Sequence, residues 1–463
     1  MKVLFCFFVP FLLFAGCKRH LNNEITIIGH LKGTDVKGIS LKSDDLSFKA
    51  PVDSNGTFVL KFVIDQSRVY QLEFNSKLNL FLIPGDSVII NKDGEDYKFS
   101  GGQSAVLSNY YLEWDKYWNK LTDTVPEKKF YSQEPDDFTK TIYKYIDALK
   151  VPLNELSKKI LNINPEFMRL EKERLKYRMI VHLQAYGYEM HKYHTGKDPV
   201  LEESFHNYMK DVNLNDSSLL QLEEYKRFLT EYIFYKSRKS FQSNIEISKD
   251  RYALTNIMLN SISHEFMNQR VIDYVIHNLI FDQTKLLLVD DKNLAIFNEL
   301  CKNKEYITDV ENLYKELQTL MPGKPAPDFE FYDSNDKKYT LSDFKGKYLL
   351  IDVWGAYCGP CIKEAPYLNQ IVLDYKGKNI EFIGTCLENN KEIWLKRIKE
   401  YKLGGIQLTV KGGWDSQFKK DYQITWIPTY ILIDKEGKII NARASKPSEN
   451  LRDLLNMTLE NKI

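Results

Sequence analysis

Two cysteines separated by two residues carry the clearest chemical signal in this chain. The stretch Trp354-Gly355-Ala356-Tyr357-Cys358-Gly359-Pro360-Cys361 follows the apolar run Tyr348 to Val353, which is typical of a buried strand, and Ile362 to Tyr375 continues with helical spacing. Cys358 is therefore expected to cap a helix, where backbone N–H groups and the helix dipole lower the pKa of its thiol. Cys361, one turn further on, is placed to resolve a mixed disulfide. The spacing thus predicts dithiol–disulfide exchange, with Cys358 as the nucleophile.

The same CxxC spacing also occurs in one half of many zinc sites. Zinc takes four nitrogen or sulfur ligands, usually with a second pair downstream. No such pair follows here, because the last histidine is His277 and the other nearby cysteines, Cys301 and Cys386, are single. We therefore expect redox chemistry and no metal. Three further histidines could be drawn as metal ligands, but packing is the simpler interpretation for them: His191, His194 and His206.

Two more residues stand out from the pattern of the segments around them. Asp352 lies in a run otherwise suited to burial, so its pKa should rise and it could take the proton of Cys361. The alternative is an aspartate satisfied by backbone N–H groups at the strand end. Further on, Pro428 precedes the apolar run Tyr430 to Ile433, where proline is tolerated only at an edge or a start, and its peptide bond could be cis.

Residues 321–463 resemble a thioredoxin-fold domain of the TlpA/ResA-like branch of the AhpC/TSA superfamily. The resemblance rests on an entry motif, a turn into the first central strand and an E-x-P on the helix after the cysteines: Pro322-Gly323-Lys324-Pro325-Ala326-Pro327-Asp328-Phe329, Leu341-Ser342-Asp343-Phe344-Lys345-Gly346-Lys347 and Glu364-Ala365-Pro366. Asp352 falls on the family's buried aspartate, Trp354 on its tryptophan and Pro428 on its cis-proline. The resemblance implies a thiol–disulfide oxidoreductase.

The resemblance also implies a substrate groove beside the cysteines. In it, Pro428 faces the thiols and keeps metals away, and Ile427 with Pro428 presents backbone to a bound strand. Trp354 and Tyr357 would contribute to the same surface, although the family usually has Trp where this chain has Tyr357. The groove surface of this chain should therefore differ from the family pattern.

The dipeptide between the cysteines, Gly359-Pro360, is the one found in thioredoxin, which by analogy favours a reducing couple. Pro360 also suits a first helical turn. Glu364 would tune thiol pKa or partner choice, or else is an ordinary acid on the helix surface. By resemblance, the substrates are protein disulfides, the reductant is a membrane thiol carrier and no organic cofactor is needed. Whether apocytochrome c is a substrate stays open.

Length and charge set broad limits on the remaining functions. The chain has 463 residues, enough for about three domains. Its formal net charge is +1, with Lys, Arg, Asp and Glu interspersed, which argues against a nucleic-acid partner.

The N-terminal apolar run, Val3 to Ala15, is typical of a signal peptide, because a membrane span needs roughly 20 residues. It ends in Leu13-Phe14-Ala15-Gly16-Cys17, which resembles a bacterial lipobox, although Phe14 stands where Leu is usual. We expect residues 1–16 to be removed and Cys17 to be lipidated, so that a membrane anchor holds a periplasm-facing protein of the cell envelope. In that compartment a free dithiol persists only if something keeps reducing it.

The fold class is multidomain α+β. Residues 24–102 alternate apolar segments with turn signals and predict a β-sandwich, whose layout resembles a domain of unknown function in Bacteroidetes lipoproteins. The expected strands are Glu24–His30, Gly38–Leu41, Thr57–Ile64, Tyr70–Phe74, Leu78–Ile83 and Ser87–Asn91. Residues 103–320 have helical spacing and predict an α-helical middle domain, with helices broken near Pro126, Pro135, Pro165 and Gly196 to Pro199. The C-terminal domain, 321–463, should have the thioredoxin-like α/β fold.

Three alternatives stay open at this point. The superfamily also contains peroxidases, but these carry a threonine three residues before the reactive cysteine, where this chain has Gly355. A non-catalytic scaffold or binding lipoprotein would need no active dithiol. Cys386 ends a strand-like run on the side expected for the active site, so it is either inert or able to form another bridge. Cys301 is expected to be a packing residue.

Overall fold

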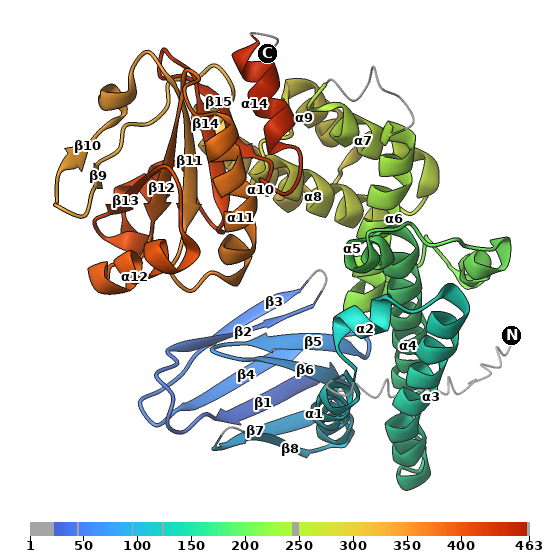
Figure 1. Cartoon of the computed structure of the whole chain (residues 1–463). Coiled ribbons are helices and arrows are strands. Elements are labelled where there is room, and N and C mark those ends of the chain that lie inside the picture. The colour runs from blue at the N-terminus through green and yellow to red at the C-terminus, as the bar shows by residue number, and fades with distance from the viewer. Residues whose placement is uncertain (1–22, 44–45, 95, 123–124, 243–249, 461–463) are drawn as a thin grey trace, which may run out of the picture. The chain divides into compact units, whose positions relative to one another are not determined.

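The computed structural model describes residues 23–43, 46–94, 96–122, 125–242 and 250–460 (Figure 1). The expected signal peptide and the lipidation residue Cys17 lie outside these residues. The chain divides into two compact units, Met1–Tyr235 and Lys236–Ile463. Within the described ranges, no helix has both the length and the apolar character that crossing a membrane requires.

The first unit begins with a β-sandwich, as the sequence predicts. Two four-stranded sheets have the orders β4-β1-β7-β8 and β3-β2-β5-β6, and inward-facing side chains of both sheets join in one hydrophobic core. Alternating burial along β4, with every second residue enclosed, produces the inner face. The strands are β1 (Glu24–His30), β2 (Gly38–Lys42), β3 (Ser47–Pro51), β4 (Thr57–Val63), β5 (Arg68–Glu73), β6 (Lys77–Leu82), β7 (Ser87–Asp93) and β8 (Asp96–Gly101).

Helix α1 (Gln103–Thr122) covers an open strand edge of the sandwich. β6 is the last strand of its sheet, so its outer N–H groups lack a strand partner. Ser108 Oγ accepts a hydrogen bond from the N–H of Phe81, and Ser104 Oγ accepts one from the N–H of Ile83, both at 3.0 Å. The helix thus satisfies backbone groups at this edge while it packs on the sheet.

The other helices of the first unit begin and end close to the predicted breaks. Two of them start with proline at a position where its missing N–H costs nothing: α3 at Pro135 and α4 at Pro165. Gly196 caps the end of α5, and its positive φ of 74° suits glycine. The helices are α2 (Glu127–Tyr131), α3 (Pro135–Lys159), α4 (Pro165–Ala185), α5 (His191–Thr195) and α6 (Glu223–Gln242), which crosses the boundary between the units.

The second unit contains helices α7 (Ala253–Glu265), α8 (Gln269–Lys285), α9 (Asp291–Leu300) and α10 (Lys304–Leu317), followed by a seven-stranded sheet. Leu287, Leu317 and Leu320 belong to the same hydrophobic core as that sheet. The predicted helical range 103–320 is therefore shared between the two units. The domain bounds 24–102, 103–320 and 321–463 stay a prediction.

The seven-stranded sheet has the order β10-β9-β13-β12-β11-β14-β15. On β11 the side chains alternate between two cores: Leu349, Ile351 and Val353 face a layer with α10 and α13, and Leu350 faces α11 and α14. Such a sheet, buried on both sides, is the expected thioredoxin-like fold. Its elements are β9 (Phe331–Tyr332), β10 (Lys338–Tyr339), β11 (Tyr348–Trp354), α11 (Gly359–Asp374), β12 (Ile380–Cys386), α12 (Lys391–Tyr401), β13 (Ile406–Val410), α13 (Gln417–Asp421), β14 (Thr429–Ile433), β15 (Ile439–Ala444) and α14 (Leu451–Leu459).

One edge of this sheet collects the loops that carry the chemistry. β11, β12 and β13 are parallel, so their carboxyl ends lie together, and the antiparallel β14 begins at the same edge. The register pairs Trp354 with Cys386 and Val353 with Thr429. The loops after β11 and before β14 therefore meet, which brings Cys358 and Pro428 together from positions far apart in the sequence.

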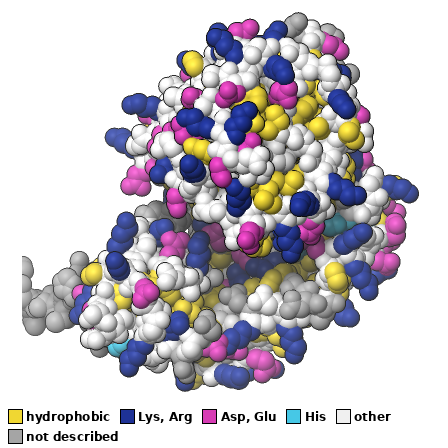
Figure 2. Space-filling view, turned by 60° about the vertical axis from the view of Figure 1, so that its left-hand side comes forward, with side chains coloured by type: hydrophobic (Ala, Val, Ile, Leu, Met, Phe, Trp, Pro, Cys, Tyr) yellow, Lys and Arg dark blue, Asp and Glu magenta, His cyan; other side chains and the backbone are white. Residues whose placement is uncertain are grey.

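Charged side chains of both signs are interspersed on the face of the molecule in Figure 2. This distribution agrees with the formal net charge of +1.

Candidate functional site

The two cysteines lie at the start of α11. Cys358 is the N-cap residue, and its Sγ accepts a hydrogen bond of 3.1 Å from the backbone N–H of Cys361. The two sulfur atoms form a disulfide bond. Because a helix N-terminus stabilises negative charge, this position favours a thiolate on Cys358 once the bond is reduced.

The two sulfur-bearing residues differ in access to solvent. Cys361 is 8% exposed, whereas Cys358 is only partly buried. Tyr357, Gly359 and Pro360 on either side of Cys358 are exposed, and Tyr357 reaches 69%. An incoming disulfide can therefore reach Cys358 first, with these three residues around it.

Pro428 lies directly before β14 and follows Ile427, which contacts the reactive cysteine. The Ile427–Pro428 peptide bond is cis, and the carbonyl oxygen of Ile427 lies 3.8 Å from Cys358 Sγ. Gly355 lies against the same segment, since a Cβ atom there would come within 2.8 Å of Ile427 Cδ1. The loop before Pro428 thus forms one wall beside the reactive sulfur.

Asp352 is an enclosed acid in the middle of the sheet. Its Oδ1 is buried and has no hydrogen-bond partner in the described part of the chain. Burial, assisted by the negative charge of Glu364, raises the pKa of Asp352 to about 7. The alternative that backbone N–H groups donate hydrogen bonds to the Asp352 carboxylate is therefore not supported for Oδ1.

Glu364 is buried on α11, so the interpretation as a helix-surface acid is wrong. It is 9% exposed, and both of its carboxylate oxygens accept hydrogen bonds from Ser448, one from the backbone N–H at 3.0 Å and one from Oγ at 2.7 Å. Ser448 was not anticipated from the sequence. No local pattern points to it, because 84 residues separate the two partners.

Trp354 lies behind the disulfide, in contrast to the expectation that it lines the substrate surface. It is 3% exposed and packs in one cluster with Cys361, Cys386 and Trp394. In this position it can support the reactive loop from inside the domain. A side chain so enclosed offers almost no area to a docked substrate.

The two free cysteines of the described residues are both buried. Cys386 shares the cluster behind the disulfide, and burial raises the pKa of its thiol to about 12. Burial likewise raises the pKa of Cys301 to about 11. A thiol with such a high pKa carries little thiolate at neutral pH, so inert packing describes both residues better than exchange chemistry.

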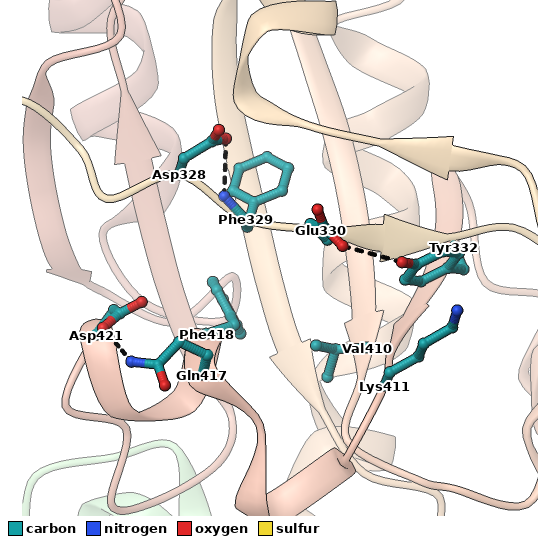
Figure 3. A pocket seen from close by; sticks show the side chains of 9 residues that line it. All are labelled: Asp328, Phe329, Glu330, Tyr332, Val410, Lys411, Gln417, Phe418 and Asp421. Atoms are coloured by element: carbon teal, nitrogen blue, oxygen red, sulfur yellow. Dashed lines mark hydrogen bonds between the residues drawn. The ribbon is translucent and has the colours of Figure 1, made fainter.

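A separate pocket of about 360 Å³ lies between the loop before β9, the end of β13 and α13 (Figure 3). Phe329 and Phe418 line it together with charged side chains, among them Glu330 and Lys411. None of the residues expected at the redox site lines this pocket. Groups of three or more His, Cys, Asp or Glu arranged to hold a metal ion are absent from the described ranges.

Comparison with known proteins agrees with this geometry. The Redoxin family model matches residues 321–457. The thiol–disulfide oxidoreductase ResA of Bacillus cereus is 37% identical over 146 residues, which are 31% of this chain and 83% of that protein. This chain belongs to the ResA-like family of thiol–disulfide oxidoreductases. ResA of Bacillus subtilis is 28% identical over 173 residues, covering 88% of its length.

Solved structures with similar sequences cover the same third of the chain. A putative thiol–disulfide oxidoreductase from Bacteroides vulgatus is 37% identical and matches 30% of this chain and 96% of its own, with a TM-score of 0.28. A thiol–disulfide oxidoreductase from Bacteroides fragilis is 30% identical and matches 29% of this chain, also with a TM-score of 0.28. The family model and the curated relatives match the thioredoxin-like part of the chain, which a β-sandwich and helices precede.

Proposed function

We propose that this chain reduces disulfide bonds in other proteins of the cell envelope through Cys358 and Cys361. The observation that carries the proposal is the position of Cys358 as a partly exposed N-cap residue, disulfide-bonded to the more enclosed Cys361 and beside the cis-Pro428. A nucleophile that is reachable and a resolving thiol that is sheltered suit two successive exchange steps.

The cycle begins with the dithiol form. The thiolate of Cys358 attacks one sulfur of the substrate disulfide, a new S–S bond forms, and the other substrate sulfur leaves as a thiolate. Cys361 loses its proton and attacks the Cys358 sulfur, which releases the second substrate sulfur and leaves the Cys358–Cys361 disulfide. Two electrons pass from the enzyme dithiol to the substrate, which takes up two protons.

Asp352 serves this cycle as the acceptor for the proton of Cys361. Its pKa of about 7 means that the carboxylate is partly protonated near neutral pH, so it can both take up and return a proton there. Glu364 contributes its charge, which raises the pKa of Asp352. Tyr357, Gly359, Pro360, Ile427 and Pro428 would contact the bound substrate segment.

The location and the electron source complete the proposal. Cys17 would carry the lipid that anchors the chain to a membrane, with the redox domain in the periplasm. A thiol reductant of the membrane would return two electrons to the Cys358–Cys361 disulfide after each turnover. No organic cofactor takes part, because sulfur exchange needs none.

A trapping experiment tests the reductase function. A Cys361→Ser variant cannot resolve the mixed disulfide, so substrates should accumulate covalently on Cys358 in cells and be identifiable by mass spectrometry. The matched control is the double variant Cys358→Ser with Cys361→Ser, which should capture nothing. Recovery of no mixed disulfide from the single variant, together with no reduction of insulin by the wild type above the dithiothreitol background, would favour the scaffold alternative.

Two further measurements test the alternatives and the location. Consumption of hydrogen peroxide by the dithiol form would indicate a peroxidase, although this chain has Gly355 where peroxidases of the superfamily carry a threonine. A Cys17→Ser variant should lose both the lipid and its place in the membrane fraction. If this variant still sediments with membranes and the wild type has an unmodified Cys17, the anchor proposal fails.

A further inference from the structure

Helix α12 carries an excess of positive charge beside the redox site. Its sequence contains four basic and two acidic residues. Lys396 and Lys399 are exposed, share one helix face and form no ion pair within the part of the chain that the structure describes. Arg397, next to them, pairs with Glu400 at 2.8 Å. The solvent side of α12 thus has a net positive charge: Lys396, Arg397 and Lys399 form a small basic surface, with the exposed Glu392 and Glu400 on the same helix.

The inner face of α12 fixes this surface close to the reactive sulfur. Trp394 is 1% exposed and belongs to the cluster of Trp354 and Cys361. Ile398 packs against the same cluster, as does Cys358. Buried aromatic packing of this kind holds a helix in one position, so the basic surface has a defined place relative to the disulfide.

Arg397 links the basic surface to the residue that precedes the nucleophile. Its guanidinium carbon lies 5.7 Å from the ring centre of Tyr357. Its Nη1 also donates to the hydroxyl of Tyr401 at 3.1 Å, so the side chain is held from two sides. The exposed ring of Tyr357 therefore forms a continuous surface between Cys358 and the cations of α12.

We propose that this basic surface of α12 docks an acidic segment next to the disulfide of a protein substrate. The inference rests on the proposed reductase function and adds a preference among its substrates. Exposed rim charges of opposite sign accelerate encounter and select partners, even where they add little to final affinity.

Geometry limits where the acidic residues must lie in the substrate. Interactions between exposed charges extend about 8 Å at physiological ionic strength. An extended segment advances about 3.3 Å per residue, so acidic side chains about two to four residues from the attacked cysteine can reach the basic surface. Acidic residues further away should have no effect.

The test compares peptides that contain one disulfide flanked by aspartate, serine or lysine at these positions. The reduced full-length chain is mixed with each peptide, and the second-order rate constant of reduction is measured by quenched flow at low and high salt. We expect the aspartate peptide to react about tenfold faster than the lysine peptide at low salt, and the difference to shrink at high salt. The double variant Lys396→Glu with Lys399→Glu should reverse this order while it reduces the serine peptide at the wild-type rate.

The matched control is the double variant Lys376→Glu with Lys378→Glu. These exposed lysines precede β12, whereas the active site follows it, roughly 20 Å away along the strand. If this control removes the preference equally, net charge and not α12 is responsible, and the proposal is overturned. Equal rates for all peptides would overturn it while leaving the reductase function intact, whereas no reduction of any peptide would overturn both.

Discussion

Replacing Asp352 with asparagine should stabilise the oxidised chain at alkaline pH. The carboxyl of Asp352 has a pKa of about 7 in the folded chain, against 3.8 as the ordinary value of an aspartate. Between these two values the folded state binds a proton that the unfolded state has lost. Stability therefore falls as pH rises through this window, and the full cost applies above pH 7.

The size of the effect follows from the pKa difference. Each pKa unit corresponds to 1.36 kcal/mol, so a rise of about three units costs the folded state about 4 kcal/mol. Asp352 as a whole residue is only partly buried, so solvent screens its charge and reduces this cost. We therefore expect the charged carboxylate to cost the folded state about 2–3 kcal/mol, roughly half to three quarters of the upper value. Asparagine has nearly the same shape and no charge, so it removes this cost.

Urea denaturation of wild type and Asp352→Asn between pH 4 and pH 8.5 measures the effect. The tryptophans that report on the second unit include Trp354 and Trp394, next to the disulfide. The stability gained by the variant should be near zero at pH 4 and reach its maximum above pH 7. Asp415→Asn, at an exposed position, is the matched control and should show no such trend. A pH-independent difference, or a variant that is less stable at pH 8, would refute the reasoning.

Three further substitutions test the packing around the site. Gly355→Thr should lower stability by about 1–3 kcal/mol in urea denaturation and slow insulin reduction, because its Cβ would meet Ile427; an unperturbed variant would contradict this. Ser448→Ala should lose about 1.5–3 kcal/mol with the hydrogen bond to the buried Glu364, whereas Ser448→Thr should keep most of it. Cys386→Ala should leave the rate of insulin reduction unchanged, and a large loss of rate would assign the buried thiol a role.

Strong local patterns allowed much of the fold to be predicted from the sequence. The alternation in β1 and β4 and the double-sided burial of β11 each leave a clear apolar signature. β3 and β8 were missed for a physical reason. Each lies at the end of its sheet and buries a single side chain, Ala50 in β3 and Phe99 in β8, so that little apolar pattern remains.

The reactive cysteines were predictable because all their determinants lie within one short stretch of chain. A strand, a CxxC pair and a helix in sequence specify the N-cap position of Cys358 without tertiary information. Pro428 required the resemblance to the family, since nothing local relates it to the cysteines. The contact between Glu364 and Ser448 was beyond reach, because it depends on how the segment after β15 folds back onto α11.

The two acids of the site, Asp352 and Glu364, differ in their hydrogen bonds. Glu364 accepts two hydrogen bonds from Ser448, so each of its carboxylate oxygens has a partner. The Oδ1 of Asp352 receives none in the described part of the chain, and a second charge close to Glu364 would meet repulsion in a poorly solvated place. Burial and the neighbouring Glu364 charge therefore raise the pKa of Asp352 to about 7, so its carboxyl is partly protonated near neutral pH. In the proposed cycle, a pKa this close to neutral pH would let Asp352 both accept the proton of Cys361 and return it.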